Sequence, residues 1–282
     1  MTNTIEIKNL EKRFDSFTLG PINLDIPKGT IVGYIGQNGA GKSTTIKLIL
    51  GLLSCDNGDI KLFGDYKPKD VFIKDRIGVV FDDLLLPEEL NLLDVEKFFS
   101  GVYKNREKEV FLSLVKSFKL NIKQKIKSYS RGMKMKLSMA IALSHHADLL
   151  ILDEATSGLD PIVREEILDL LLDFMLDENH TILISSHILS DLEKIADYIA
   201  FINNGKILFM ERKDKLEEEY GMCSLSNQQA EKLDKSAIVG RRTHSFGQEL
   251  LVKKSLIPKD IKIQKPSIED IMIYYVKGEN EK

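Results

Sequence analysis

The apolar and polar positions in the first part of the chain predict a β-rich start followed by a buried strand. Residues 5–7 and 22–26 alternate apolar and polar side chains, as half-buried antiparallel strands do. Residues 27–29, Pro-Lys-Gly, indicate a turn. Residues 30–35 are almost continuously apolar, which favours a central strand covered on both faces, and they run directly into Gly36.

The middle of the chain combines a long helical stretch with short apolar runs. From residue 92 to about residue 144, apolar positions recur at helical spacing. Residues 149–152 and 181–184 are short apolar runs that end in polar residues, and we expect further parallel strands there. Residues 197–202 and 207–210, joined by Asn-Asn-Gly-Lys, predict an edge hairpin that closes the core near residue 210.

The last part of the chain has a weaker pattern. Residues 213–220 form a charged helical stretch, and a weakly patterned segment follows. Ser267 and Asp270 have the spacing of a capping box that opens a final helix. Apolar side chains at helical spacing favour packing of this helix on the main domain over a ligand site; they are Ile268, Ile271, Met272 and Tyr275.

Composition and charge exclude several classes of protein. The chain has 282 residues, 43% of them hydrophobic, which suffices for one substantial core and a small appended domain. A formal net charge of -3 argues against a nucleic-acid partner, because a dedicated nucleic-acid binder needs a basic surface. Apolar runs stop well short of the roughly 18 to 20 residues of a membrane span.

Two further features of the sequence predict the cellular compartment of the protein. The N-terminus lacks the basic and apolar segments of a secretory signal, so we expect a cytoplasmic protein. Cys55 and Cys223 are far apart and form no CxxC, which excludes a zinc ribbon and makes a disulfide framework improbable; we interpret both as ordinary thiols.

A glycine-rich loop between the predicted buried strand and a helical run carries the first chemical signal. Its pattern is G-x-x-x-x-G-K-[ST], whose backbone N–H groups surround phosphate oxygens while the helix start adds a positive end. Lys42 supplies charge at the β and γ phosphates, and the Ser43 hydroxyl is expected on Mg²⁺. The loop predicts ATP and Mg²⁺ as ligands; it comprises Gly36, Gln37, Asn38, Gly39, Ala40, Gly41, Lys42, Ser43 and Thr44.

Two adjacent carboxylates follow the apolar run at residues 149–152. Ligands of open α/β sheets bind at the carboxyl ends of the strands, which is where Asp153 and Glu154 are expected. Side chains of consecutive residues diverge, so Asp153 can hold Mg²⁺ through water while Glu154 faces the space beyond the γ-phosphate. There Glu154 would orient or deprotonate the attacking water.

Two further segments resemble one family. Residues 153–161, Asp-Glu-Ala-Thr-Ser-Gly-Leu-Asp-Pro, resemble the Walker B motif and D-loop of ABC-type ATPases. Residues 129–134 resemble the family's signature, Leu-Ser-Gly-Gly-Gln: Ser130 and Gly132 are retained, and Arg131 replaces a glycine. A serine hydroxyl and a glycine N–H at a helix start can bind phosphate. The resemblance implies that they bind ATP held by a second cassette in a head-to-tail dimer.

The resemblance also assigns roles outside these segments. His187, after the strand predicted at 181–184, matches the switch histidine that contacts the γ-phosphate and joins Glu154 and Lys42 as catalytic residues. Phe14 corresponds to the aromatic residue that stacks on adenine. His145 and His146 match no family position and are interpreted as surface or packing residues.

One position departs from the family. Asp82 stands where the family ordinarily has a glutamine that contacts Mg²⁺ and the attacking water. A carboxylate is also a hard oxygen ligand, but it is shorter and adds negative charge beside the triphosphate. We hypothesise that Asp82 keeps the coupling role with an altered metal dependence, so the implied metal ligands are Ser43, Asp82 and Asp153.

Basic residues dominate between Lys104 and Lys136. A solvated helical face is the ordinary interpretation of such a run. The alternative is a face toward an anionic membrane surface or acidic partner loops, where each cation contributes on the order of 1 kcal/mol.

The resemblance implies an α/β P-loop NTPase of the ABC ATPase fold. Its expected parts are an N-terminal antiparallel β region, a RecA-like parallel core and an inserted α-helical subdomain near residues 83–145. Residues 1–215 would form the ATPase domain, and residues 216–282 a small C-terminal extension.

The implied function is that of the ATP-hydrolysing subunit of an ABC transporter. ATP would close a homodimer, or a heterodimer with a related cassette, and hydrolysis would reopen it. The membrane segments would belong to a separate permease, with this chain peripheral on the cytoplasmic face of the cell membrane. The signature form and residues 266–270 most resemble bacterial exporters of drugs, peptide antibiotics or lipids.

Two alternatives stay open at this point. The first is a soluble ABC ATPase, such as an iron–sulfur assembly factor, with no membrane partner. The second is a cassette that binds ATP but hardly turns it over, because Asp82 and Arg131 depart from the common pattern; Glu154 argues against this second alternative.

Overall fold

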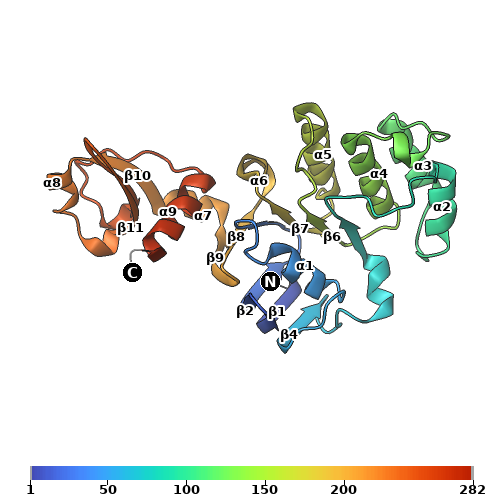
Figure 1. Ribbon diagram of the computed structural model, residues 1–282, viewed down its shortest axis with the longest axis horizontal. Helices are drawn as coiled ribbons and strands as arrows, with labels where there is room; N and C mark the ends of the chain where they lie inside the picture. The colour runs from blue at the N-terminus through green and yellow to red at the C-terminus, as the bar shows by residue number, and fades with distance from the viewer. Residues whose placement is uncertain (1, 281–282) are drawn as a thin grey trace.

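A computed structural model describes residues 2–280, with side-chain environments for residues 2–276, and contains three β-sheets (Figure 1). The central sheet has six strands in the order β5-β6-β7-β3-β8-β9. A three-stranded sheet in the order β2-β1-β4 lies beside it, and a third sheet, β10-β12-β11, forms the part nearest the C-terminus.

The central sheet confirms the parallel core expected from the apolar runs. Neighbouring strands from β5 to β8 pair in parallel, and only the edge strand β9 is antiparallel, as the predicted hairpin requires. The strands are β3 (Ile31–Ile35), β5 (Ile77–Val80), β6 (Leu149–Asp153), β7 (Thr181–Ser186), β8 (Tyr198–Asn203) and β9 (Lys206–Arg212).

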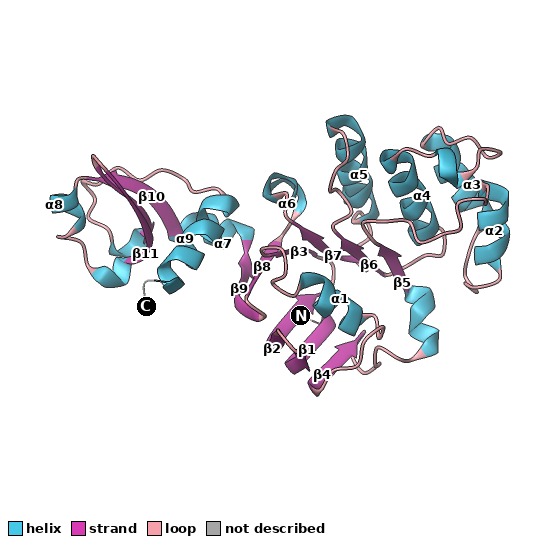
Figure 2. Ribbon diagram, viewed as in Figure 1, coloured by secondary structure: helices cyan, strands magenta, loops and turns pink. Residues whose placement is uncertain are grey.

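Both faces of this sheet are covered, which explains why its strands are continuously apolar. Leu150 and Leu152 of β6 are buried in one cluster with residues of the helices α4 (Arg131–Leu143), α5 (Pro161–Phe174) and α6 (Leu189–Ile195). Figure 2 shows these three helices on one side of the sheet. Leu149 and Ile151 face the opposite layer, where α1 and the N-terminal sheet lie. That layer consists of α1 (Lys42–Ile49), β1 (Asn3–Arg13), β2 (Thr18–Pro27) and β4 (Asn57–Leu62).

A separate helical region follows β5. It contains α2 (Leu92–Ser100), α3 (Lys108–Ser117) and α4, and it has its own hydrophobic cluster, in which Val95 and Phe111 are fully buried. Three cations of the basic run form ion pairs with two carboxylates: Lys125 and Lys127 share Glu89, and Lys134 pairs with Glu88. Part of the run is therefore an ion-paired surface.

The two histidines without a family position are packing and surface residues, as expected. His145 is fully buried, and its ring stacks on Tyr103 at a centroid distance of 3.9 Å. Burial lowers the pKa of His145, which favours its neutral form. His146 is exposed and pairs with Glu107. The two cysteines are free thiols.

The C-terminal part contains a sheet that the weak pattern did not predict. Its strands are short, and β11 carries four charged or polar residues toward its exposed end, so the apolar alternation covers only a few positions. The elements of this part are α7 (Lys213–Glu219), β10 (Tyr220–Leu225), α8 (Asn227–Ala230), β11 (Ile238–His244), β12 (Gly247–Lys253) and α9 (Ile268–Asn280), with short 3₁₀ turns at Lys235–Ala237 (η3) and Lys254–Leu256 (η4). Two further 3₁₀ turns lie earlier in the chain, η1 (Val71–Arg76) before β5 and η2 (Ile126–Ser128) before α4.

The predicted final helix is confirmed as α9. The Asp270 N–H donates to the Ser267 hydroxyl at 3.0 Å, and the Ser267 N–H donates back to the Asp270 carboxylate at 2.9 Å, as in a capping box. Ile268 and Ile271 are buried in the same hydrophobic cluster as the central sheet, with Met272 and Tyr275 packed against it. The helix therefore packs on the main domain.

The last sheet is joined to the main domain through apolar contacts. Tyr220 of β10 and Leu251 of β12 belong to the cluster that contains β6 and α5. The Tyr275 ring lies 5.0 Å from that of Phe209 on β9, and its hydroxyl is 2.6 Å from that of Tyr220. We propose a boundary near residue 215, with residues 216–282 as the extension and a helical subdomain near residues 83–145. Between residues 2 and 280, no helix is long and apolar enough to cross a bilayer.

Ile271→Ala should lower the free energy of unfolding by about 2–5 kcal/mol, because it removes a fully buried side chain between α9 and the main domain. The matched change on the same helix is Ile273→Ala, at a side chain 36% exposed, and it should cost less than about 1 kcal/mol. Denaturant unfolding followed by circular dichroism measures both. Equal losses for the two variants would contradict the packing described.

Candidate functional site

The glycine-rich loop joins β3 to α1 at the carboxyl edge of the central sheet. Gly41 has a φ of 112°, and a Cβ placed on it would lie 2.5 Å from the Leu19 side chain. A Cβ on Gly36 would lie 2.4 Å from the Ile202 carbonyl oxygen. Gly41 is required because of its positive φ and its close contact, and Gly36 is required because of its close contact alone.

A cavity of about 380 Å³ opens above this loop. It brings together segments that are distant in sequence, among them the loop, the end of β5 and the ends of β6 and β7. Most of the predicted nucleotide and catalytic residues meet here. The lining residues are Phe17, Asn38, Gly39, Gly41, Lys42, Ser43, Thr44, Asp82, Glu154, Ser157 and His187.

Three predicted catalytic side chains are connected in a row. The buried Lys42 ammonium lies 3.3 Å from one carboxylate oxygen of Glu154 and donates to the Gly36 carbonyl at 2.8 Å. The other oxygen of Glu154 lies 2.5 Å from Nδ1 of His187. The carboxylate thus lies between Lys42 of the glycine-rich loop and the histidine at the end of β7.

The end of β7 supports both carboxylates. The Ser185 hydroxyl donates to Asp153 at 2.6 Å and accepts from the Glu154 N–H at 3.1 Å. Glu154 has a φ of 56°, an unusual conformation for a residue other than glycine, and backbone strain of this kind is concentrated at functional sites. Ser185 was not among the predicted site residues, because a serine inside an apolar run has no motif of its own.

The first turn of α1 is supported from beneath. The Tyr34 hydroxyl lies 3.1 Å from the hydroxyl of Thr45, which donates to the Gly41 carbonyl at 2.9 Å. Burial raises the pKa of Tyr34 well above its ordinary value, so the phenol stays neutral. This contact anchors the helix whose N-terminus faces the cavity.

Two aromatic rings lie at the rim. Phe17 lines the cavity, and its Cζ approaches the Cβ position of Gly41. Phe14, the predicted adenine-stacking residue, is 43% exposed, and its ring is stacked on Phe17 with centroids 6.4 Å apart. Phe17 was missed by the sequence analysis, although it follows Phe14 by one short turn.

Asp82 lines two cavities, one of which contains the predicted phosphate-binding residues. It lines the nucleotide cavity and also a second cavity of about 180 Å³, which Arg131 and Lys134 line as well. The first cavity holds the predicted phosphate ligands, and the second lies against the start of α4. Asp82 therefore connects the two regions.

The signature residues Ser130 and Gly132 do not line the nucleotide cavity of their own chain. Ser130 caps α4, and its hydroxyl accepts from the Met133 N–H at 3.2 Å. The Arg131 guanidinium lies over Gly158, within 3.3 Å of the position a Cβ would take there. A nucleotide bound at the glycine-rich loop of this chain would therefore not contact Ser130 or Gly132 of the same chain within this cavity.

The oxygen donors in the nucleotide cavity fit Mg²⁺. They are the Ser43 hydroxyl and the Asp82 carboxylate, and Mg²⁺ prefers such hard ligands completed by water and substrate phosphates. Asp153, the third predicted metal ligand, does not line this cavity, and its carboxylate accepts from the Ser185 hydroxyl. The described residues contain no group of three or more His, Cys, Asp and Glu side chains suited to hold a metal alone. The donor set matches an ion that arrives with a nucleotide.

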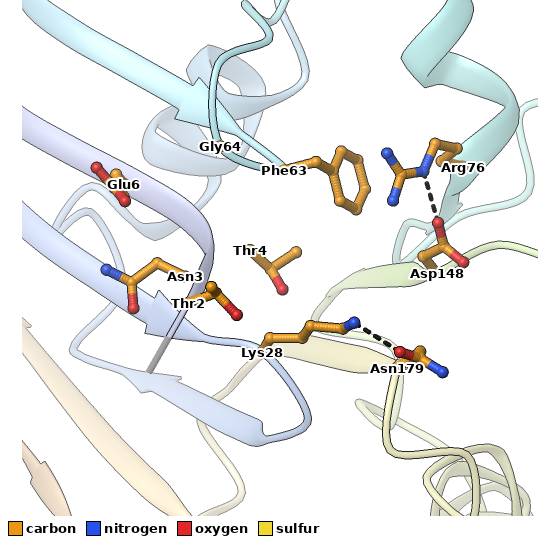
Figure 3. A pocket seen from close by; sticks show the side chains of 10 residues that line it. All are labelled: Thr2, Asn3, Thr4, Glu6, Lys28, Phe63, Gly64, Arg76, Asp148 and Asn179. Atoms are coloured by element: carbon orange, nitrogen blue, oxygen red, sulfur yellow. Dashed lines mark hydrogen bonds and ion pairs between the residues drawn. The ribbon is translucent and has the colours of Figure 1, made fainter.

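A larger cavity, of about 550 Å³, lies at the opposite edge, where the strands begin (Figure 3). Three of its charged side chains already have partners: Arg76 pairs with Asp148 at 2.5 Å, and Lys28 donates to Asn179 at 2.6 Å. The guanidinium of Arg76 also lies 3.8 Å from the centre of the Phe63 ring. Since ligands of open α/β sheets bind at the carboxyl edge, we assign nucleotide binding to the smaller cavity.

Comparison with known proteins agrees with this geometry. The family model described as "ABC transporter" matches residues 19–157. The chain is 39% identical over 219 residues to the lantibiotic transport ATP-binding protein SrtF of Streptococcus pyogenes, covering 77% of this chain and 91% of that protein.

Two further proteins are similar to this chain, one by sequence and one by structure. The bacitracin transport ATP-binding protein BcrA of Bacillus licheniformis is 37% identical over 215 residues, covering 74% of this chain and 69% of that protein. A solved structure of an ATP-binding subunit of an ABC transporter superposes with a TM-score of 0.69 at 28% identity, covering 77% of this chain and 92% of the other.

Phe14→Ala should weaken ATP binding about two- to tenfold, because an aromatic stacking contact contributes about 0.5–1.5 kcal/mol. Tripolyphosphate has no adenine ring, and its affinity should not change. Titration calorimetry measures both ligands, and Phe246→Ala, at a ring 98% exposed in the extension, serves as the control. An equal loss for tripolyphosphate would show that Phe14 acts on the loop and not on the base.

Proposed function

The chain belongs to the family of ATP-binding proteins of ABC transporters, and from this membership we propose that it drives export of a peptide antibiotic or a similar compound through a separate membrane permease. It is an ABC ATPase, which binds ATP and hydrolyses it to ADP and phosphate. The substrate class is supported by the names of the relatives SrtF and BcrA, which are a lantibiotic and a bacitracin transport protein. The export direction is carried over from the resemblance of the signature form and residues 266–270 to bacterial exporters. Their transport role also favours a transporter subunit over a soluble assembly factor.

One observation carries the catalytic proposal: Glu154 lies between Lys42 and His187. We assign the loop N–H groups and Lys42 to the β and γ phosphates, where fixed positive charge stabilises the charge that develops during transfer. Mg²⁺ would be held by Ser43, Asp153 and Asp82 together with water, and it supplies charge neutralisation for the phosphate oxygens.

Proton transfer is assigned to Glu154. As the water oxygen attacks the γ-phosphorus and the bond to the β–γ bridging oxygen breaks, the carboxylate accepts the water proton. Its backbone N–H is held by Ser185, and this contact orients the side chain toward the cavity. His187 would donate a hydrogen bond to a γ-phosphate oxygen.

The start of α4 supports a dimer of cassettes. Ser130 and Gly132 have the helix-start chemistry that binds phosphate, yet they lie outside the nucleotide cavity of their own chain. In a head-to-tail dimer they would contact the ATP of the second cassette. The partner would be a second copy or a related cassette.

An exposed apolar surface supports a membrane partner. Val71 and Phe72 of η1 are 80% and 64% exposed. The Lys74 ammonium of η1 donates to the Leu50 carbonyl at 2.6 Å, and the Lys104 N–H donates to the Asp75 carboxylate of η1 at 3.4 Å. The segments after α1 and after α2 therefore both contact η1. Contiguous exposed apolar patches mark interaction sites. Further exposed apolar side chains of these segments are Leu52, Phe98 and Val102.

We propose that this surface, Leu52, Val71, Phe72, Phe98 and Val102, docks a cytoplasmic segment of the permease. The chain would then be cytoplasmic and peripheral at the inner face of the membrane. Its net charge of -3 accords with a protein partner, because the chain lacks the overall positive charge that a dedicated nucleic-acid binder needs.

Glu154→Gln should lower ATP turnover by about 100-fold or more, because it removes the proton acceptor while it keeps a side chain of the same shape. The variant should accumulate as an ATP-bound dimer. Affinity capture of tagged Glu154→Gln protein with ATP, from gently solubilised cells of the native host, should therefore recover a polytopic membrane protein, identified by mass spectrometry.

Two double variants serve as controls for the capture. Phe72→Asp in the Glu154→Gln chain should lose the membrane protein and keep the ATP-bound dimer. Phe246→Asp, at an exposed ring of the extension, should keep both. Recovery of soluble proteins alone would contradict the transporter proposal.

Asp82→Ala should raise the Mg²⁺ concentration for half-maximal turnover about tenfold, because one oxygen ligand is lost from the metal environment. The matched control is Asp83→Ala, because Asp83 lines only the second cavity. Steady-state ATPase rates across a Mg²⁺ titration measure the effect. A profile unchanged from that of the native chain would remove Asp82 from the proposed metal ligands.

A further inference from the structure

The helix that follows His187 is short and lies between two other parts of the molecule. α6 begins two residues after His187 and ends at Ile195. The Ile188 N–H donates to the Ser186 hydroxyl at 2.9 Å, which ties the residues on either side of His187 to each other. The imidazole is itself half exposed, so its position depends on the backbone that enters α6.

The C-terminal extension holds this helix through Glu193. The Ile268 N–H, at the first residue of α9, donates to the Glu193 carboxylate at 2.6 Å. The Lys213 ammonium, at the first residue of α7, donates to the Glu193 backbone carbonyl at 2.7 Å. The first residue of α7, the helix that leads into the extension, and the first residue of α9 therefore both contact one residue of α6.

The electrostatics of this contact are favourable. α9 has 13 residues, and its unpaired N–H groups and dipole make its N-terminus positive. The Glu193 carboxylate lies at that terminus and accepts one of these N–H groups, while the capping box of Ser267 and Asp270 satisfies another. Glu193 thus completes the cap of α9 from another element.

The opposite side of α6 is held by α5, which begins directly after the D-loop residues. Lys194 pairs with Glu165 at 2.6 Å, and Asp191 lies 3.9 Å from Arg164. α6 is therefore held between the D-loop helix and the extension. A packed helix of seven residues moves as a unit, because protein interiors transmit small displacements.

We propose that Glu193 is a positioning residue for His187, through which the C-terminal extension controls the rate of ATP hydrolysis. The proposal rests on the catalytic role assigned to His187. The bond from the start of α9 to Glu193 sets the position of α6, and α6 sets the position of the imidazole beside Glu154. Displacement of the extension changes turnover without a change at the phosphate loop.

The first test uses Glu193→Ala and Glu193→Gln in the full-length chain. Glu193→Ala should lower kcat for ATP about tenfold with KM unchanged, because the phosphate loop stays intact while the imidazole shifts. Glu193→Gln keeps an acceptor oxygen for the Ile268 N–H and should recover most of kcat. Lys265→Ala breaks an ion pair with Glu217 inside the extension and should leave kcat unchanged.

The second test removes the donor. Ile268→Pro deletes the N–H that Glu193 accepts, at the first helical position, where proline is well tolerated. Ile268→Val keeps the N–H and matches the reduction of the buried side chain. Ile268→Pro should lower kcat as Glu193→Ala does, and Ile268→Val should not.

A double-variant cycle separates positioning from general loss of structure. In a His187→Ala chain, Glu193→Ala should have no further effect on kcat, because the group that it positions is gone. A second tenfold loss in that background would overturn the proposal, and so would an unchanged kcat for Glu193→Ala alone. If His187→Ala itself kept full turnover, the catalytic role of His187 would fail, and the positioning role with it.

Discussion

The parallel pairing of β6 with β7 is the constraint on which the catalytic edge depends. Asp153 is in register with Ser185, and this register brings the serine hydroxyl between the Asp153 carboxylate and the Glu154 N–H. The backbone of Glu154 can then keep a positive φ, which turns its side chain from the strand toward Lys42. His187 reaches the same carboxylate because it follows the end of β7 directly. A shift of this register by one residue would separate the aspartate from the serine and point alternate side chains to the opposite face.

The fold and much of the site were predictable because their signals are local. Continuous apolar runs predicted β3, β6 and β7, since strands covered on both faces need apolar side chains at every position. The glycine loop was recognisable because only glycine fits its close contacts with Leu19 and Ile202. Lys42, Glu154 and His187 were brought together as proposed, since each lies at the end of a strand or at the helix that follows one.

The remainder could not be predicted, because it depends on contacts between distant segments. Ser185 is one of two serines that end an apolar run, and only the register with β6 gives it a role. Phe17 lines the cavity because the turn after Phe14 folds back on it. The sheet of the extension was missed because its buried positions are supplied by β10 and β12, while the second half of β11 is polar and exposed or half-buried.

The continuity of the apolar core across the domain boundary limits what genetics can reveal about the extension. Leu251, Ile271 and Tyr274 are buried among side chains of the central sheet and its helices. A gene shortened after β9 would encode a protein in which apolar side chains at Phe209 and along α6 are newly exposed to solvent. Such a protein would be prone to aggregation and proteolysis. A null phenotype from such a truncation would report loss of the folded protein, whether or not the extension has a signalling role. The two parts therefore depend on each other for stability, and exchange of the extension between related genes would have to carry the matching surface of α6 with it.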